Sequence, residues 1–328
     1  VSEQVIATAS IPDASETVAG KVSVGTQTFG GNKTIIGESA TVGSAFTVQN
    51  LSHTVVAEIS NLGDSYFNEV RIGKGKGAGA NNTVLGKTAL GNNTTGVNAT
   101  AIGVESLASN TTGNHNTAVG ADALYKNTTG GKNTAIGVLP LFNNTIGASN
   151  TAIGYYSMYS NISGSFNLSL GDSSLHLNTI GFENTAIGFS ALYSNTTGNY
   201  NIGIGTVALY SNTTGSGNVG IGDKSGRYIA DGTTNNSISD NSVYIGANTK
   251  ALANNQTNQI VIGYDATGAG SNTATIGNTS IVKTVLRGVI AHSTSYTVAT
   301  LPTGALGDTA FVTDAVAPTY LGALTGGG

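Results

Sequence analysis

The chain has 328 residues, of which only 9% are charged; it contains 47 glycines, no cysteine and no tryptophan, and its formal net charge is −4. Without cysteine it has neither a disulfide framework nor a thiolate metal site, and without a Lys/Arg cluster it lacks the usual footprint of a nucleic-acid-binding protein. No apolar run approaches the roughly 18 residues of a membrane-spanning segment, so we expect no membrane insertion. Such a composition is typical of a disordered chain or of an internally repeated one.

The first 77 residues lack a repeat, and we expect them to form a β-rich attachment or shaft segment. Apolar and polar residues alternate over 21–37, which predicts β-hairpins. Residues 53–73 predict further strands that lead into the next segment.

Residues 78–224 carry a 17-residue repeat with the consensus N-T-A-I-G-x-x-A-L-Y-x-N-T-T-G-x-x. The glycine that closes the N-T-A-I-G motif recurs without insertion at Gly86, Gly103, Gly120, Gly137, Gly154, Gly171, Gly188, Gly205 and Gly222. Seventeen residues are too few for a helical repeat, which needs roughly 33. They fit one coil of a β-solenoid with two short strands, the second less certain than the first, and a glycine at each turn.

Two aliphatic columns arise when the coils are stacked, and we expect both to lie inside as structural ladders. The first includes Ile102, Val119, Ile136, Ile153, Ile187 and Ile204. The second includes Leu107, Leu124, Leu141, Leu192 and Leu209.

Small residues lie between the Thr and Ile positions of the motif, where a solvated face would normally carry charge. This column includes Ala101, Ala118, Ala135, Ala152 and Ala186. We interpret it as an inter-chain face, on which other copies of the chain pack to form a homotrimer.

Asparagine recurs in two columns, one starting the motif and one preceding the Thr-Thr pair. The second includes Asn127, Asn144, Asn195 and Asn212. Stacked asparagines can hydrogen-bond from coil to coil, so we predict a structural role. Many of these residues also lie in N-x-[ST] sequons, a coincidence that the repeat explains without glycosylation.

A third column is aromatic, and it supplies the candidates for surface recognition. Its members include Tyr125, Tyr159, Tyr193 and Tyr210, and His176 occupies the same position. The rings can pack against saccharides. They can equally pack against one another or across a trimer interface, and we favour these two interpretations over saccharide binding. Recurring Thr-Thr pairs raise a minor alternative, ice binding.

The register slips after Gly222. We expect residues 225–241 to form an inserted loop, either a plain connector or a recognition loop using Arg227 and Tyr228, followed by terminal coils over 242–290. Residues 291–328 read as the start of a C-terminal tip module or a linker.

Catalysis needs convergent acids, bases or nucleophiles, but the four histidines are dispersed and the acidic residues occupy variable repeat positions. We therefore expect no enzyme, no cofactor and no metal site.

The motifs NTAIG (184–188), SVYIG (242–246) and TATIG (273–277) resemble the head repeats of YadA-like trimeric autotransporter adhesins. NTAIGFSALYSNTTG (184–198) also resembles repeats of phage tail-fibre proteins. These resemblances imply an all-β fold, a left-handed parallel β-roll built by three chains. They imply a structural and host-recognition part of a phage tail fibre, on a virion tail or cell surface, with a glycan or protein receptor and other tail or fibre proteins as partners. The alternative is a bacterial cell-surface adhesin or extracellular filament that uses the same repeat.

Overall fold

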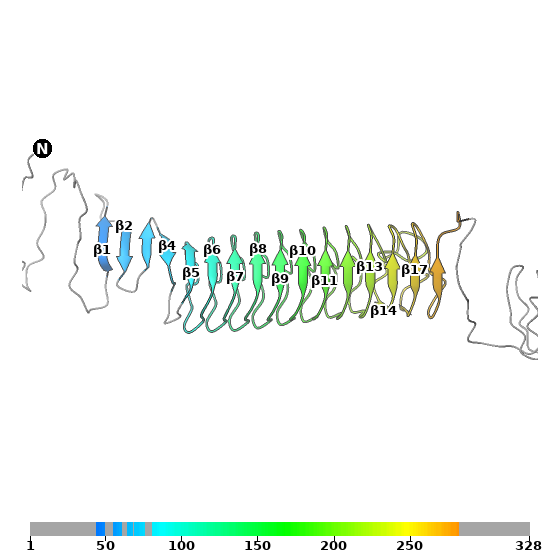
Figure 1. Ribbon diagram of the computed structural model, residues 1–328, viewed down its shortest axis with the longest axis horizontal. Coiled ribbons are helices and arrows are strands. Elements are labelled where there is room, and N and C mark those ends of the chain that lie inside the picture. Colours follow the sequence, from blue (N-terminus) through cyan, green and yellow to red (C-terminus); the bar gives the residue numbers. More distant parts are fainter. Residues whose placement is uncertain (1–43, 50–54, 61–63, 68, 76–80, 282–328) are drawn as a thin grey trace, which may run out of the picture.

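The computed structural model describes residues 44–49, 55–60, 64–67, 69–75 and 81–281. Over these residues the chain is all-β, with strands arranged side by side along the long axis of the molecule (Figure 1). The hairpins predicted over 21–37 and the tip module predicted from 291 lie outside the described residues.

In the described part of the chain before the repeats there are four strands: β1 (Ser44–Gln49), β2 (Val55–Ser60), β3 (Ser65–Phe67) and β4 (Val70–Gly73). Each pairs antiparallel with the next, and β4 pairs antiparallel with β5 (Thr83–Gly86). The strands predicted within 53–73 are therefore confirmed.

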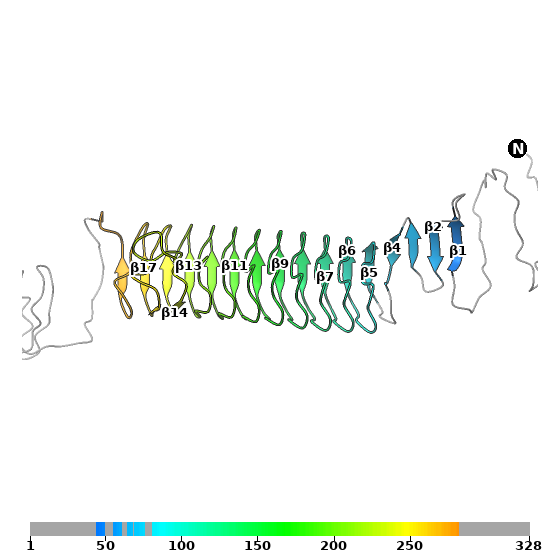
Figure 2. The same ribbon diagram turned by 180° about the vertical axis from the view of Figure 1, so that it is seen from behind.

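The repeats form a parallel β-solenoid, as the 17-residue period predicts. Each motif supplies one strand, and aligned residues pair 17 positions apart, as Ala118 does with Ala135. The strands are β6 (Thr100–Ile102), β7 (Thr117–Val119), β8 (Thr134–Ile136), β9 (Thr151–Ile153), β10 (Leu168–Leu170), β11 (Thr185–Ile187), β12 (Ile202–Ile204) and β13 (Val219–Ile221). The stack continues through β15 (Val243–Ile245), β17 (Ile260–Ile262) and β18 (Ala274–Ile276) in one 16-stranded sheet (Figure 2).

The other side of each regular coil contains no strand, so the second strand expected from the sequence is wrong. Its residues form turns, and the column leucine has a left-handed backbone, with φ of 53° at Leu124. A left-handed residue lies outside the β region. The backbone amides on this side of the coil nevertheless donate hydrogen bonds to the next coil. Leu107 N donates to Ala123 O at 2.9 Å, and Ser109 N donates to Tyr125 O at 3.0 Å.

The interior of the coil is formed by the leucine column and the small-residue column. Leu107, Leu124, Leu141, Leu192 and Leu209 are fully buried, in agreement with the sequence prediction. The prediction for the isoleucine column is wrong, because Ile136 is 38% exposed and the other members are partly exposed. The strand alternation turns Thr and Ile outward and the central residue inward.

The proposed inter-chain face is also corrected, because all five of its alanines are fully buried within a single chain. They are Ala101, Ala118, Ala135, Ala152 and Ala186. The physical reason is the thinness of the coil. A Cβ added at Gly203, which occupies this column, would lie 3.0 Å from Leu192 Cγ. In the coils from β6 to β13, where this column holds only alanine, serine or glycine, the space opposite the leucines is therefore filled by small residues, and isoleucine points outward.

Residues 225–241 do more than bulge from the stack. The step from β13 to β15 is 24 residues, and the next two steps are 17 and 14. The longer coil adds β14 (Ser239–Asp240), which pairs with β16 (Gln256–Thr257) in a second small sheet. Tyr244 replaces the small interior residue here, and its hydroxyl lies 2.8 Å from Ser239 Oγ.

Candidate functional surfaces

The asparagine columns are structural, because their side chains form continuous hydrogen-bonded ladders inside the coil. Asn127 Nδ2 donates to Asn110 Oδ1 at 2.8 Å and to Gly130 O at 2.9 Å. In the other column, Asn133 accepts at Oδ1 from Asn150 N at 3.0 Å. Asn127, Asn144 and Asn195 are fully buried, and Asn212 is 1% exposed. In the folded coil, the amide nitrogens of these sequons are therefore not accessible for glycosylation.

The sequence-predicted recognition residues lie together in one stacked aromatic column. The rings of Tyr125, Phe142, Tyr159, His176, Tyr193 and Tyr210 stack in this order, with centroids 5.0–5.4 Å apart and planes within 9° of parallel. The inserted loop closes the column, because the Arg227 guanidinium lies 4.7 Å from the centroids of both Tyr210 and Tyr228.

This packing decides what the aromatic column can do. From Phe142 to Tyr210, both faces of each ring are occupied by a neighbouring ring or by Arg227, and Tyr125 is stacked on one face by Phe142, which favours the interpretation that the residues pack against one another. The column adds stacking to the coils from Tyr125 to Tyr210, and Lys126 and Arg227 add cation–π attraction at Phe142 and Tyr210. Tyr125, Tyr159, Tyr193, Tyr210, Arg227 and Tyr228 are thus brought together, but as a stabilising array.

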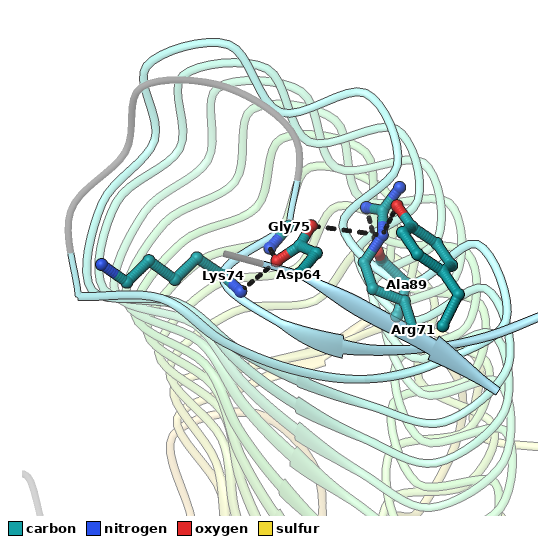
Figure 3. A network of polar contacts seen from close by, with 6 residues as sticks. Asp64, Arg71, Lys74, Gly75 and Ala89 are labelled. Carbon is teal, nitrogen blue, oxygen red and sulfur yellow. Dashed lines mark hydrogen bonds and ion pairs between the residues drawn. The ribbon is translucent and has the colours of Figure 1, made fainter. Parts of the chain in front are cut away.

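The first coil is closed by a polar network (Figure 3). Asp64 Oδ1 accepts hydrogen bonds from the amides of Lys74 and Gly75 at 2.6 and 3.1 Å, and its other carboxylate oxygen lies 3.7 Å from Arg71 Nε. Arg71 Nη1 donates to Ala89 O at 3.1 Å. In later coils the equivalent carbonyl accepts from the preceding coil, as Ala123 O does. Arg71 therefore satisfies the carbonyl that the first coil would leave open.

The outer strand face is formed by the Thr and Ile columns that the strands turn outward, including the isoleucines that the sequence predicts to be buried. From β5 to β18, its two central columns contain only threonine and aliphatic residues, with no charge. Several aliphatic members are well exposed, including Leu85 at 43%, Leu170 at 41% and Ile276 at 52%. A long, flat face of this kind is unusual on a monomeric soluble protein.

Large rings at the edges of this face were not predicted as functional. Tyr155 and Phe189 lie where strands end, and Phe166 and Tyr200 lie where strands begin. All four are about half exposed or more. They occupy the variable x positions of the consensus, so the repeat pattern alone does not single them out. For Phe166 and Tyr200, a large ring at a position that is mostly polar in other coils is the available signal, whereas the position of Tyr155 and Phe189 holds polar and apolar residues alike and gives none.

No group of three or more His, Cys, Asp or Glu side chains able to hold a metal ion occurs within the described ranges. The same part of the chain has no helix long and apolar enough to cross a bilayer. In the comparisons with known proteins, no protein family, curated protein or solved structure matches this chain.

Proposed function

We propose that this chain is a rigid shaft segment of an extracellular fibre that works as a homotrimer in a phage tail fibre. The observation that carries the proposal is the charge-free outer strand face, which runs the length of the solenoid. Burying this Thr and aliphatic surface against other copies would be favourable, at roughly 25 cal/mol per Å² of apolar area.

The internal ladders suit a shaft, because asparagine hydrogen bonds join the regular coils in series and stacked rings join the coils from Tyr125 to Tyr210. At about 4.8 Å per strand, the stack from β5 to β18 extends about 53 Å. In this proposal the solenoid supplies length and stiffness, and it presents a distal module that binds a glycan or protein receptor on the host.

The test is the solution mass of the full chain by light scattering, with two charge variants. The parent is expected to have the mass of three chains. Ile187→Glu places a carboxylate on the outer strand face, and we expect it to give single chains that keep their β-sheet circular dichroism spectrum. Ile146→Glu is the matched control, because Ile146 is 57% exposed but lies outside the strand face.

A parent with the mass of one chain would contradict the trimer. So would an Ile187→Glu variant that stays folded and keeps the parent mass. The phage assignment has a separate test, immunogold labelling of virions and of bacterial cells with an antiserum against the chain. Gold on tail fibres is the expected result, and gold on the cell envelope alone would point to a bacterial adhesin instead.

A further inference from the structure

Two short rows of exposed side chains flank strands β9 to β12, one at each edge of the outer strand face. We call them the rim rows. The first contains Tyr155, Asp172 and Phe189, and the second contains Phe166, Glu183 and Tyr200. Each row presents an aromatic ring, a carboxylate and a second aromatic ring in three successive coils. No other three successive coils between β5 and β18 repeat this order at either edge.

The coil register aligns each row with the long axis. In the first row, Ser173 N donates to Tyr155 O at 2.8 Å, and Ser190 N donates to Asp172 O at 2.9 Å. In the second row, Tyr200 N donates to Phe182 O at 3.2 Å, beside Glu183. Since neighbouring coils are about 4.8 Å apart, the two rings of one row lie about 10 Å apart, with the carboxylate between them.

The rims differ from the stacked aromatic column because their rings face solvent. Tyr155 is 48% exposed, Phe166 64%, Phe189 55% and Tyr200 53%. Two of them are braced edge-on, Tyr155 by Tyr156 at 4.2 Å and Tyr200 by Phe182 at 5.1 Å. Exposed rings held in place by neighbours are features of binding surfaces, because little side-chain freedom is lost when a ligand docks.

The chemistry of a row matches one class of ligand. The C–H face of a pyranose packs on an aromatic ring, and sugar hydroxyls donate hydrogen bonds to a carboxylate, where charge strengthens the bond. An extended glycan repeats both features along its length, as the row does along the solenoid. The carboxylates of Asp172 and Glu183 disfavour an acidic polysaccharide. We propose that each rim row binds an extended, neutral glycan that lies parallel to the long axis of the solenoid.

This inference goes beyond the proposed shaft function. It needs only the folded solenoid of one chain, so it does not depend on the trimer. It also places glycan contacts along the side of the shaft, apart from any distal module.

The test is affinity electrophoresis of the full chain in native gels containing soluble neutral polysaccharides: hydroxyethyl cellulose, xyloglucan, glucomannan, mixed-linkage β-glucan and dextran. We expect at least one polymer to retard the parent.

The double variants Tyr155→Ala/Phe189→Ala and Phe166→Ala/Tyr200→Ala should each weaken retardation, and the combined fourfold variant should lower affinity by about tenfold or more. Tyr264→Ala is the matched control, because Tyr264 holds the same edge position in the β17 coil, is 69% exposed and has no partner ring two coils away.

The proposal is overturned if no polymer retards the parent, or if the fourfold variant is retarded like Tyr264→Ala. It is also overturned if the rim variants lose the parent mass in light scattering while glycan retardation is unchanged, because the rows would then be a protein interface. A single-chain Ile187→Glu variant that is still retarded supports the glycan rows independently of the trimer.

Discussion

The regular coils of β5 to β13 and the terminal coils of β15 to β18 use the same strand motif but differ in how their buried polar groups are satisfied. In the regular coils, each column asparagine reaches a partner 17 residues away, as Asn161 does with Asn144 and Asn178. In the terminal coils the steps are 24, 17 and 14 residues. Among the described residues there, Asn236 Oδ1 and both polar atoms of the Gln259 side chain have no hydrogen-bond partner. In the regular coils, Ser211 Oγ and Asn212 Oδ1 also lack one, and both lie in the last of these coils, next to the 24-residue step.

This difference shows that the hydrogen bonds of the asparagine ladders require coils of constant length. An asparagine column works because every coil repeats the same donor and acceptor at the same height. A coil of another length breaks this alignment, and buried polar groups then lose their partners. We therefore expect substitutions to cost more in the regular coils than equivalent ones in the terminal coils.

The largest contrast should come from two glycines. A Cβ at Gly137, where φ is 135°, would lie 2.6 Å from the carbonyl oxygen of Gly154, so Gly137→Ala should cost about 3 kcal/mol or more. Gly232 has φ of 73° but nothing within 4 Å of an added Cβ, so Gly232→Ala should cost about 1 kcal/mol. Thermal unfolding followed by circular dichroism measures both. Equal losses would contradict the packing of the regular coils.

The asparagine column offers the next comparison. Asn161→Ala removes hydrogen bonds to Asn144, Asn178 and Gly164 and leaves buried groups unpaired, at a cost of about 3 kcal/mol. Asn212 ends the ladder, its Oδ1 has no partner within the described residues, and Asn212→Ala should cost about half as much. Chemical denaturation distinguishes the two. A larger loss for Asn212→Ala would show that the ladder does not act as described.

A smaller effect is expected where Arg71 closes the first coil. Arg71→Met keeps the length of the side chain but removes the donor to Ala89 O and the cation beside Asp64, at a cost of about 2 kcal/mol. Hydrogen exchange should show the loss as faster exchange in β5 and β6, with β12 and β13 unchanged. Uniformly faster exchange would contradict a local closing role.

The smallest effect is expected at the end of the aromatic column. Arg227→Ala uncovers Tyr210 and should cost about 1 kcal/mol, between the ranges for exposed and for desolvated cation–π contacts, because Arg227 is half-buried. The near-ultraviolet circular dichroism of the tyrosines should change as well. Lys126→Ala, which removes a cation 5.3 Å from the Phe142 ring within the column, is the matched control and should leave Tyr210 covered.

The period alone predicts much of the fold. The unbroken glycine spacing predicts the parallel solenoid, the leucine column its interior, and the asparagine columns their ladders. The repeat period does not indicate which face of a three-residue strand points inward, since Ala135 and Ile136 are both apolar and either could be buried. Which of the two residues is buried depends on the thickness of the coil. That thickness is set by leucines with a left-handed backbone, such as Leu124, in segments whose sequence resembles that of a strand.

The candidate surfaces were less predictable for a related reason. The tyrosines of the aromatic column repeat, so the sequence revealed them, but their stacking turns them from recognition candidates into a stabilising array. Tyr155 and Phe189 do not repeat in every coil, and their alignment at one edge becomes visible only when the register is known.

The inward and outward assignment of neighbouring residues is the central claim, and a pair of glutamates one residue apart tests it most directly. Ala135→Glu forces a carboxylate into the filled interior, and we expect it to abolish cooperative thermal unfolding or to lower the free energy of unfolding by several kcal/mol. Ile136→Glu places the same charge on the outer strand face, where the coil should stay folded and only self-association should be lost. If Ala135→Glu melts like the parent while Ile136→Glu unfolds the coil, the assignment is contradicted.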